Sequence, residues 1–336
     1  MKAYELHPNE GFASLTLVDR AVPGALGAHD VRVRIRATSL NYRDLVIARG
    51  AKTRSKRVVP VSDGAGEVLE VGAQVTRVRV GDRVAGSFFP TWVDGHIDAT
   101  HHANALGGSI DGVLAEQVVL PDTGVVVLPE YLSFEQGATL PCAGLTAWHA
   151  LHEATQVRSG DTVLVQGTGG VSIFALQLAR LAGARVVATT SSPGKAARLT
   201  ELGAAAVVDY KQTPEWGEPV RKAAGGDGVD IAVEVGGAGT FDQSVKALRF
   251  GGALSLIGVL TGTQAQINTH AIVHKSLHVN GVYVGSLAMF ERFTRALEAT
   301  RLVPLVDKVF PFAEARAAYD YLASGAHFGK VIVRVD

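Results

Sequence analysis

The 336-residue sequence contains a single cysteine, Cys142, which excludes any disulfide within the chain and any structural zinc site built from several cysteines. It also lacks an excess of charge of either sign, because 32 lysines and arginines balance 32 aspartates and glutamates. A protein that binds the phosphate backbone of a nucleic acid is expected to be basic. We therefore expect no nucleic-acid partner.

Long apolar runs are missing as well. No stretch approaches the ~18 consecutive apolar residues of a membrane helix. The first 17 residues carry Lys2, Glu5 and Glu10 and have no apolar core of the kind found in a signal peptide. With 47% hydrophobic and 19% charged residues, the chain is too apolar to be disordered. We expect a folded, cytoplasmic protein with no membrane segment.

Glycine, in contrast, is abundant, with 38 of 336 residues or 11% against a usual ~7%. The length predicts about two domains. Residues 1–127 have the pattern of short strands broken by turns: Val31, Val33 and Ile35 alternate with arginines, as in a half-buried strand, and Glu67–Val84 continues in this style. Residues 87–112 have no such pattern, and a stretch of that length is typical of a functional loop or lid.

After Pro129, strands alternate with helices. Strands are predicted at 162–165, 185–190, 206–208, 229–235 and 253–258, with helices at 171–182, 192–202, 214–224 and 241–248. This alternation indicates an α/β fold with a doubly wound parallel sheet. We predict a β-rich domain at 1–127, the parallel-sheet domain at 128–264, and a segment 265–336 that completes the sheet edge and returns, through a strand at 330–335, to the first domain.

A glycine loop lies between the first strand and the first helix of the parallel sheet. In this loop the first glycine permits a tight turn, and the second lets backbone N–H groups approach a pyrophosphate at the helix N-terminus. A serine replaces the third glycine of the fingerprint and is small enough to pack near the strand. The βαβ context predicts a dinucleotide site. The residues expected to hold it are Gly167, Thr168, Gly169, Gly170, Val171 and Ser172.

An acidic residue is absent where NAD sites place one to bind the ribose, because Ser172–Thr200 contains no aspartate or glutamate. Hydroxyls and cations near the end of the second strand suit a 2′-phosphate, which a carboxylate would repel. We therefore predict a preference for NADP(H) over NAD(H). Alternatively, Ser192 only caps its helix, and the nearby cations are solvated. The predicted cofactor residues also include Thr190, Ser191, Ser192, Lys195, Arg198, Tyr210, Gly258, Val259 and Lys330.

The order of motifs resembles the medium-chain dehydrogenase/reductase superfamily over essentially the full length. The motifs are Asn41–Asp44, Asp63–Val68, Val80–Val84, Cys142–Trp148, the glycine loop and Gly329–Val331. Within the superfamily, the chain is most similar to the zinc-free quinone oxidoreductase and enoyl reductase branch. The resemblance implies a GroES-like catalytic domain, a Rossmann cofactor domain, a site in the cleft between them, and a homodimer formed edge to edge through the cofactor-domain sheets.

The resemblance also shows where this chain departs from zinc-dependent members, which hold the catalytic metal with a cysteine, a histidine and a second cysteine. The matching positions carry Asn41, Ser62 and Cys142, a poor donor set for zinc. The four-cysteine lobe of those enzymes is missing. The histidines of the 87–112 loop, His96, His101 and His102, are more simply polar loop residues than ligands. We expect no zinc.

Without zinc, the sequence favours reduction of quinones or α,β-unsaturated carbonyls, because the charge that develops on such acceptors is delocalised and hydrogen-bond donors suffice to stabilise it. In the resembling positions, Asn41, Tyr42 and Thr146 are candidate donors, and Asp44 and Asp63 organise them. Ser62 and Cys142 complete the candidate catalytic set, although Cys142 is more simply interpreted as a core residue, because buried structural cysteines are commoner than reactive ones. Two alternatives stay open: an alcohol dehydrogenase with or without a metal, and a protein that binds NADPH without turnover.

Overall fold

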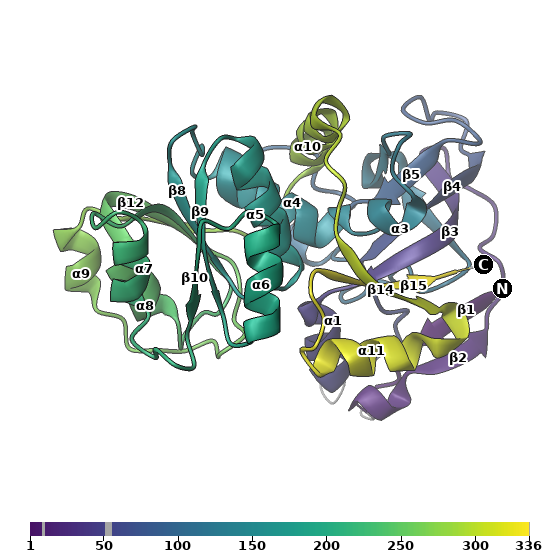
Figure 1. Cartoon of the computed structure of the whole chain (residues 1–336). Coiled ribbons are helices and arrows are strands. Elements are labelled where there is room, and N and C mark those ends of the chain that lie inside the picture. Colours follow the sequence, from purple (N-terminus) through teal and green to yellow (C-terminus); the bar gives the residue numbers. More distant parts are fainter. Residues whose placement is uncertain (9–10, 51–55, 336) are drawn as a thin grey trace. The chain divides into compact units, whose positions relative to one another are not determined.

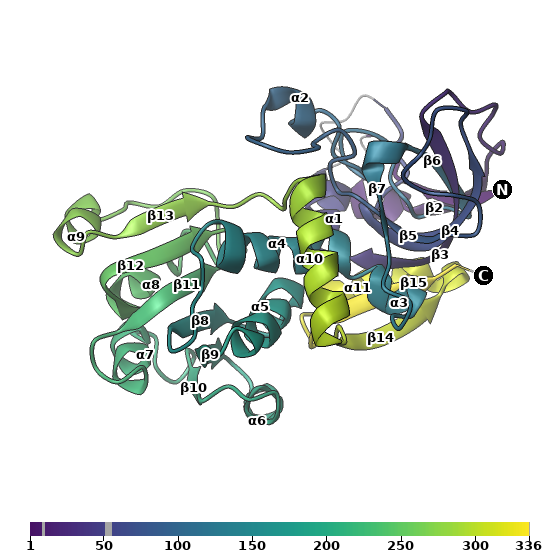
Figure 2. The same cartoon turned by 90° about the horizontal axis from the view of Figure 1, so that it is seen from above.

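The structure, a computed structural model, describes residues 1–8, 11–50 and 56–335 and contains two compact units (Figures 1 and 2). The first unit consists of Met1–Leu145 and Val284–Asp336, and the second of Thr146–Tyr283. The predicted domain junctions, after residues 127 and 264, both lie before those of the structure, which follow Leu145 and Tyr283. Leu128 still bonds within the first unit, its N–H donating to the Arg83 carbonyl, and a strand at His278–Gly281 still belongs to the parallel sheet.

The first unit is β-rich, as predicted for a GroES-like domain. Its strands are β1 (Lys2–Glu5), β2 (Thr16–Asp19), β3 (Asp30–Leu40), β4 (Asp63–Val71), β5 (Arg83–Gly86), β6 (Gln117–Pro121), β7 (Val125–Val127), β14 (Val306–Pro311) and β15 (Lys330–Arg334). Its helices are α1 (Tyr42–Arg49), α2 (Ala99–His102), α3 (Phe134–Gly137), α10 (Leu287–Thr300) and α11 (Ala315–Ala323). The main sheet has the order β14-β15-β3-β4-β5-β7, and β6 also pairs with β3.

Strand β3 runs through the centre of this sheet. Its apolar residues Val31, Val33 and Ile35 are buried, which confirms the predicted alternation, and Arg34 is exposed. Arg32 is the exception at only 8% exposed, because its guanidinium donates to Glu70 and to the carbonyls of Pro23 and Gly24. The end of β3 pairs antiparallel with β15, so that Leu40 lies opposite Val331.

Glu67–Val84 contains the end of β4 and the start of β5 with turns between them, in agreement with the predicted pattern of short strands broken by turns. Strand β4 ends at Val71, and residues 72–82 form the turns. Gly81 lies in the left-handed region with φ of 90°, and the Asp82 carboxylate accepts a hydrogen bond from the Arg79 N–H. These local bonds compete with a sheet ladder for the same backbone groups.

The expected loop at 87–112 contains the single turn of α2 and a small aromatic cluster of its own. Phe88, Phe89 and Trp92 are at most 2% exposed. The Phe88 and Phe89 ring centroids lie 4.6 Å apart, and the Arg43 guanidinium stacks 4.4 Å from the centroid of Phe88. The carbonyl of Trp92 accepts a hydrogen bond from the N–H of Leu287 at the start of α10. The loop is therefore anchored within the first unit by buried rings.

The second unit has the predicted doubly wound parallel sheet. Its strands are β8 (Thr162–Gln166), β9 (Arg185–Thr190), β10 (Ala206–Asp209), β11 (Val229–Glu234), β12 (Leu248–Leu256) and β13 (His278–Gly281). Its helices are α5 (Gly170–Leu181), α6 (Pro193–Glu201), α7 (Gly217–Ala223), α8 (Phe241–Ala247) and α9 (Thr269–His274); α4 (Leu145–Trp148) precedes them. The strand order is β10-β9-β8-β11-β12-β13, with every pairing parallel, which is the Rossmann order.

Helices cover both faces of this sheet. Figure 2 shows α5 and α6 on one face and α7 and α8 on the other. The Lys275 ammonium caps the end of α8 by donating to the carbonyls of Val245, Lys246 and Leu248, where the helix dipole favours a positive charge. Within the ranges that the structure describes, no helix is both long and apolar enough to cross a membrane.

Candidate cofactor and catalytic sites

The glycine loop of the second unit leads from β8 into α5. Gly167 adopts a left-handed φ of 70° and donates its N–H to the Thr189 carbonyl at 2.8 Å, which produces the tight turn. Gly169 is the N-cap of α5, and a Cβ added there would meet nothing within 4 Å. Open space thus borders Gly169 at the N-terminus of α5, where the first N–H groups of a helix have no partner within the helix, an arrangement suited to a phosphate group.

Ser172, which stands in place of a third glycine, packs against the strand. It is 2% exposed, and its hydroxyl donates to the Gln166 carbonyl at 2.6 Å. Thr168 is also buried, at 6% exposed. The small side chains therefore hold the loop close to the sheet.

The residues predicted to select the cofactor gather at the end of β9. Thr190 is buried, and its carbonyl accepts the N–H of Tyr210, which follows β10 and is 40% exposed. Ser191 is half-buried, and Ser192 caps α6 by accepting the Lys195 N–H, as the alternative interpretation of this serine required. On α6, Lys195 is half-buried, whereas Arg198 is exposed.

Glu234, at the end of β11, is a buried residue at the carboxyl edge of the parallel sheet that we did not identify from the sequence. Its carboxylate is fully buried and accepts from the N–H groups of Gly236 (2.8 Å) and Gly237 (2.9 Å) and from the Thr240 hydroxyl (2.6 Å). The Gln166 amide, 2.7 Å away, and the Ser244 hydroxyl donate to its second oxygen. The available signal was a charge at the end of the apolar stretch Ile231–Val233, in a strand that already carries Asp230 near its start.

Gly258 and Val259 follow β12 at the same edge of the sheet. Gly258 donates its N–H to the Glu234 carbonyl, and a Cβ added to it would lie 2.0 Å from the Val235 carbonyl oxygen, so no side chain fits there. Val259 is 48% exposed. Rossmann sheets bind dinucleotides at the carboxyl ends of their parallel strands. In this chain those ends carry the glycine loop, Ser191, Tyr210, Glu234 and Gly258. The residues present fit such a cofactor.

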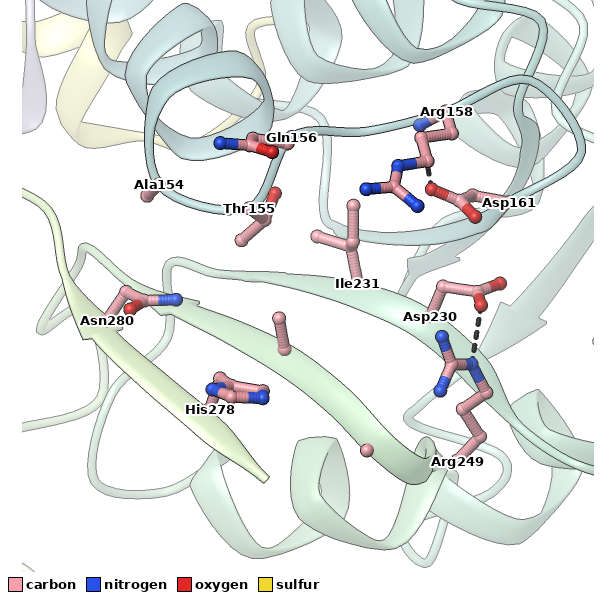
Figure 3. A pocket seen from close by; sticks show the side chains of 12 residues that line it. Ala154, Thr155, Gln156, Arg158, Asp161, Asp230, Ile231, Arg249, His278 and Asn280 are labelled. Atoms are coloured by element: carbon pink, nitrogen blue, oxygen red, sulfur yellow. Dashed lines mark hydrogen bonds and ion pairs between the residues drawn. The ribbon is translucent and has the colours of Figure 1, made fainter. Parts of the chain in front are cut away.

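A polar hollow of about 310 Å³ lies at the opposite, amino end of these strands (Figure 3). Asp161 directly precedes β8, and its carboxylate accepts the Arg158 N–H at 2.7 Å. Asp230 accepts from the Thr162 N–H at 2.7 Å and from Arg249 at 2.5 Å. Asp230 thus joins the start of β11 to the starts of β8 and β12, whereas Asp161 fixes the turn before β8. The hollow is separate from the cofactor edge.

Most of the candidate catalytic residues meet in a buried cluster in the first unit. Asn41 caps α1 and is 8% exposed; its N–H donates to the Asp44 carboxylate at 2.8 Å. Asp63 begins β4 and is fully buried. Its carboxylate accepts the Ser62 hydroxyl at 2.6 Å and the Cys142 N–H at 3.0 Å. The resemblance therefore identified residues that are neighbours in space.

Lys330, predicted to bind the cofactor, lies in this cluster and not in the unit that carries the glycine loop. It is 2% exposed, and its ammonium donates to the Asn41 amide oxygen at 2.5 Å and to the Leu40 carbonyl at 2.7 Å. Burial lowers its pKa, and the charge of Asp63 opposes that shift. The amide oxygen of Asn41 is therefore engaged inside the protein.

Tyr42 and Thr146 are placed differently. Tyr42, the first residue of α1, is 41% exposed, so its side chain is accessible. Thr146 belongs to the second unit and is 2% exposed. Of the predicted donors, Tyr42 is the one with an accessible side chain.

The donor set of this cluster does not fit zinc. Burial and the charge of Asp63 raise the pKa of the Cys142 thiol, which opposes the thiolate that a metal needs. The Ser62 hydroxyl is committed to Asp63, and Asn41 to an ammonium. Across residues 1–8, 11–50 and 56–335, no group of three histidine, cysteine or acidic side chains could hold a metal. In the loop, the His101 ring accepts a hydrogen bond from the N–H of Asp98, the N-cap of α2, and lies 6.1 Å from the ring of Trp92.

Asp44 makes stability depend on pH. Its Oδ1 is buried without a hydrogen-bond partner among the described residues, and burial raises its pKa to about 6, although Arg43, 3.8 Å away, opposes the shift. In an unfolded chain the value is ~3.9. Between these values the folded state binds a proton that the unfolded state does not, so this carboxyl lowers stability as pH rises from about 4 to 6.

Asp44→Asn keeps the acceptor for the Asn41 N–H. We therefore expect this variant to lack the decrease of about 3 kcal/mol in the free energy of unfolding that the Asp44 carboxyl causes as pH rises. Urea unfolding of both proteins between pH 3.5 and 8 measures the difference in the free energy of unfolding. The free energy of unfolding of the variant, relative to that of the wild type, should increase as pH rises to 6 and then stay nearly constant. Asp320→Asn, on the exposed side of α11, is the control. A difference between Asp44→Asn and wild type that does not change with pH would contradict the expectation.

The chain matches two families of known proteins. Residues 27–130 match the alcohol dehydrogenase GroES-like domain, and residues 170–300 match the zinc-binding dehydrogenase family. A zinc-type alcohol dehydrogenase-like protein of Schizosaccharomyces pombe is 42% identical, and the alignment covers 99% of each chain. The chain thus belongs to the medium-chain dehydrogenase/reductase superfamily of nicotinamide-dependent oxidoreductases.

Further relatives carry different activities in their names. A quinone oxidoreductase of Pseudomonas aeruginosa is 29% identical over 93% of each chain, and an acryloyl-coenzyme A reductase of Metallosphaera sedula is 29% identical over 90% of this chain and 92% of its own. Among solved structures, an NAD-dependent alcohol dehydrogenase has a TM-score of 0.89 at 32% identity, and a mycobacterial protein in complex with NADPH has 0.84 at 26% identity. Both alignments cover 100% of each chain.

Proposed function

We propose that this protein is a zinc-independent oxidoreductase that transfers hydride from NADPH to quinones or α,β-unsaturated carbonyls. The composition of the buried cluster carries this proposal. At the positions that resemble zinc ligands the cluster offers one thiol, one amide and one hydroxyl, and a lysine ammonium bonds to the amide. The bound nicotinamide supplies the hydride, and the chain must orient it and stabilise the charge left on the acceptor.

Hydrogen-bond donors suffice for such acceptors, because the new charge is spread over an enolate or a semiquinone-like oxygen. The accessible phenol of Tyr42 is the proposed donor to that oxygen. Asp44 and Asp63 keep the backbone around Asn41 and Cys142 in place through their hydrogen bonds. For a simple alcohol or aldehyde, the site would lack the metal that usually stabilises an alkoxide.

We propose NADPH as the cofactor in preference to NADH, because hydroxyls and cations suit a 2′-phosphate that a carboxylate would repel. The end of β9 presents Ser191 and Ser192 and no carboxylate, and Lys195 and Arg198 follow on α6. The mycobacterial neighbour in complex with NADPH supports this choice, whereas the NAD-dependent neighbour supports the opposite one.

A screen of NADPH oxidation over quinones, enones and aldehydes tests the hydride acceptor. We expect kcat/KM for quinones or enones to exceed that for simple aldehydes by about 100-fold or more, since Lewis-acid help worth several kcal/mol is missing for the latter. Alcohol dehydrogenase activity, which the names of several relatives favour, would instead show efficient turnover of aldehydes and alcohols. Tight NADPH binding with no turnover on any acceptor would indicate a non-catalytic cofactor-binding protein.

Assembly and location follow as further proposals. Strand β13 lies at the edge of the parallel sheet, pairs with β12 on one side and exposes Val279 at 39%. We propose that two copies pair through this edge into a homodimer in the cytoplasm. Light scattering of the purified protein measures the assembly, and a monomeric mass at micromolar concentration would contradict it.

A further inference from the structure

The Lys330 side chain is the cation of the buried cluster in the first unit. It begins β15, and the pairing of that strand with β3 brings it to the residues that lead into α1. Lysine is rarely this buried unless it is paired. Its ammonium donates to two oxygens, the Leu40 carbonyl and the Asn41 amide oxygen. A positive charge is thus built into the protein at this point.

The surroundings of this charge are those that a metal cation would have. Asp63 and Asp44 are both fully buried, and each attracts the ammonium. Cys142, the only cysteine in the chain, is also close enough to interact with it. Asp63 in turn accepts from the Cys142 N–H. Carboxylates, an amide oxygen and the one sulfur therefore surround a lysine.

A second cation at this place would meet two obstacles. The oxygen of Asn41 already binds the ammonium, and a divalent ion beside the ammonium would be repelled in a region that water does not screen. The chain therefore matches a family named for zinc binding, but the ammonium of Lys330 lies where that metal would need a ligand from position 41.

We propose that the ammonium of Lys330 takes the place of the metal ion in this chain: it holds Asn41 in position and excludes a divalent cation from the cluster. Lys330 is then a positioning residue and a determinant of metal selectivity. This inference rests on the proposed zinc-independent function and names the residue responsible for it.

The test restores metal ligands with and without the lysine. The double variant Asn41→Cys/Ser62→His offers two thiols and an imidazole, a donor set that suits tetrahedral metal ions. In a second protein the same pair is combined with Lys330→Gln, which keeps an N–H donor but removes the charge. Cobalt(II) is the probe, because its thiolate absorption bands report ligation independently of turnover. We expect the triple variant to bind one cobalt ion about 100-fold or more tightly than the double variant.

Lys275→Gln, in the second unit, is the matched control; it removes another lysine that bonds to backbone carbonyls and should leave cobalt affinity unchanged. If Lys330→Gln does not fold, the double variant alone decides, because with Lys330 present it should bind cobalt no more tightly than the wild type. Tight binding by the double variant, or equal affinities of the double and triple variants, would overturn the proposal. The proposed function is tested separately, by the turnover of the wild type after chelation.

Discussion

Replacing Glu234 with alanine is expected to lower the free energy of unfolding by about 4 kcal/mol or more. The substitution removes the acceptor of five hydrogen bonds in a fully buried place, and each unpaired donor left behind costs about 1–3 kcal/mol, less where water enters the space. The loop Gly236–Gly237 also loses the carboxylate that fixes it at the cofactor edge. Urea unfolding gives the stability, and NADPH titration gives the effect on binding.

Glu215→Ala is the matched control, because Glu215 is an exposed glutamate whose ion pair with Lys246 is screened by water and contributes little to stability. Glu234→Gln should lie between the two, since it keeps the shape and one acceptor oxygen. If Glu234→Ala lost no more stability than Glu215→Ala, the buried network would not be the element that holds β8, β11 and α8 together.

Placing a carboxylate at the end of β9, with Ser191→Asp, is expected to weaken NADPH binding by about 100-fold or more and to leave NADH binding equal or better. A carboxylate repels the 2′-phosphate by about 2–4 kcal/mol at an effective dielectric constant near 20, whereas it accepts a hydrogen bond from a ribose 2′-OH. Fluorescence titration with both cofactors measures the two dissociation constants for wild type and variant.

The cations of α6 give a second measure of the same site. Lys195→Ala and Arg198→Ala should each reduce NADPH affinity by about 10-fold, because each removes a charged partner of the phosphate, and should leave NADH affinity unchanged. Lys222→Ala, on the helix α7 that covers the other face of the sheet, is the control and should change neither. Equal affinities of the wild type for NADH and NADPH would contradict the predicted preference for NADPH.

Local patterns predicted the features of this fold that depend on short stretches of chain. The alternation of β3, the turn at Gly167 and the cap of α6 at Ser192 each depend on neighbouring residues, and all three are present in the structure. The parallel sheet itself followed from the alternation of strands and helices. The Rossmann arrangement was implied by the family resemblance. The motifs also identified the residues of the buried cluster.

Features that depend on distant residues could not be predicted in this way. The partners of Glu234 range from Gln166 to Ser244, and the bond between Lys330 and Asn41 joins residues 289 positions apart. We therefore missed Glu234 and the bond of Lys330 to Asn41, and the cofactor role of Lys330 stays a prediction. Arg32 followed the outward positions of its strand in sequence, yet the carbonyls of an adjoining loop bury it.

The most direct test of metal-free hydride transfer is to measure NADPH-driven reduction of a quinone and an enone before and after exhaustive dialysis against a chelator, with zinc content determined on the same samples. We predict that at least one acceptor is reduced at an unchanged rate after dialysis and that the protein holds far less than one zinc ion per chain. Loss of that activity on chelation with recovery on adding zinc, or zinc-dependent alcohol oxidation in a protein that reduces neither acceptor, would contradict it.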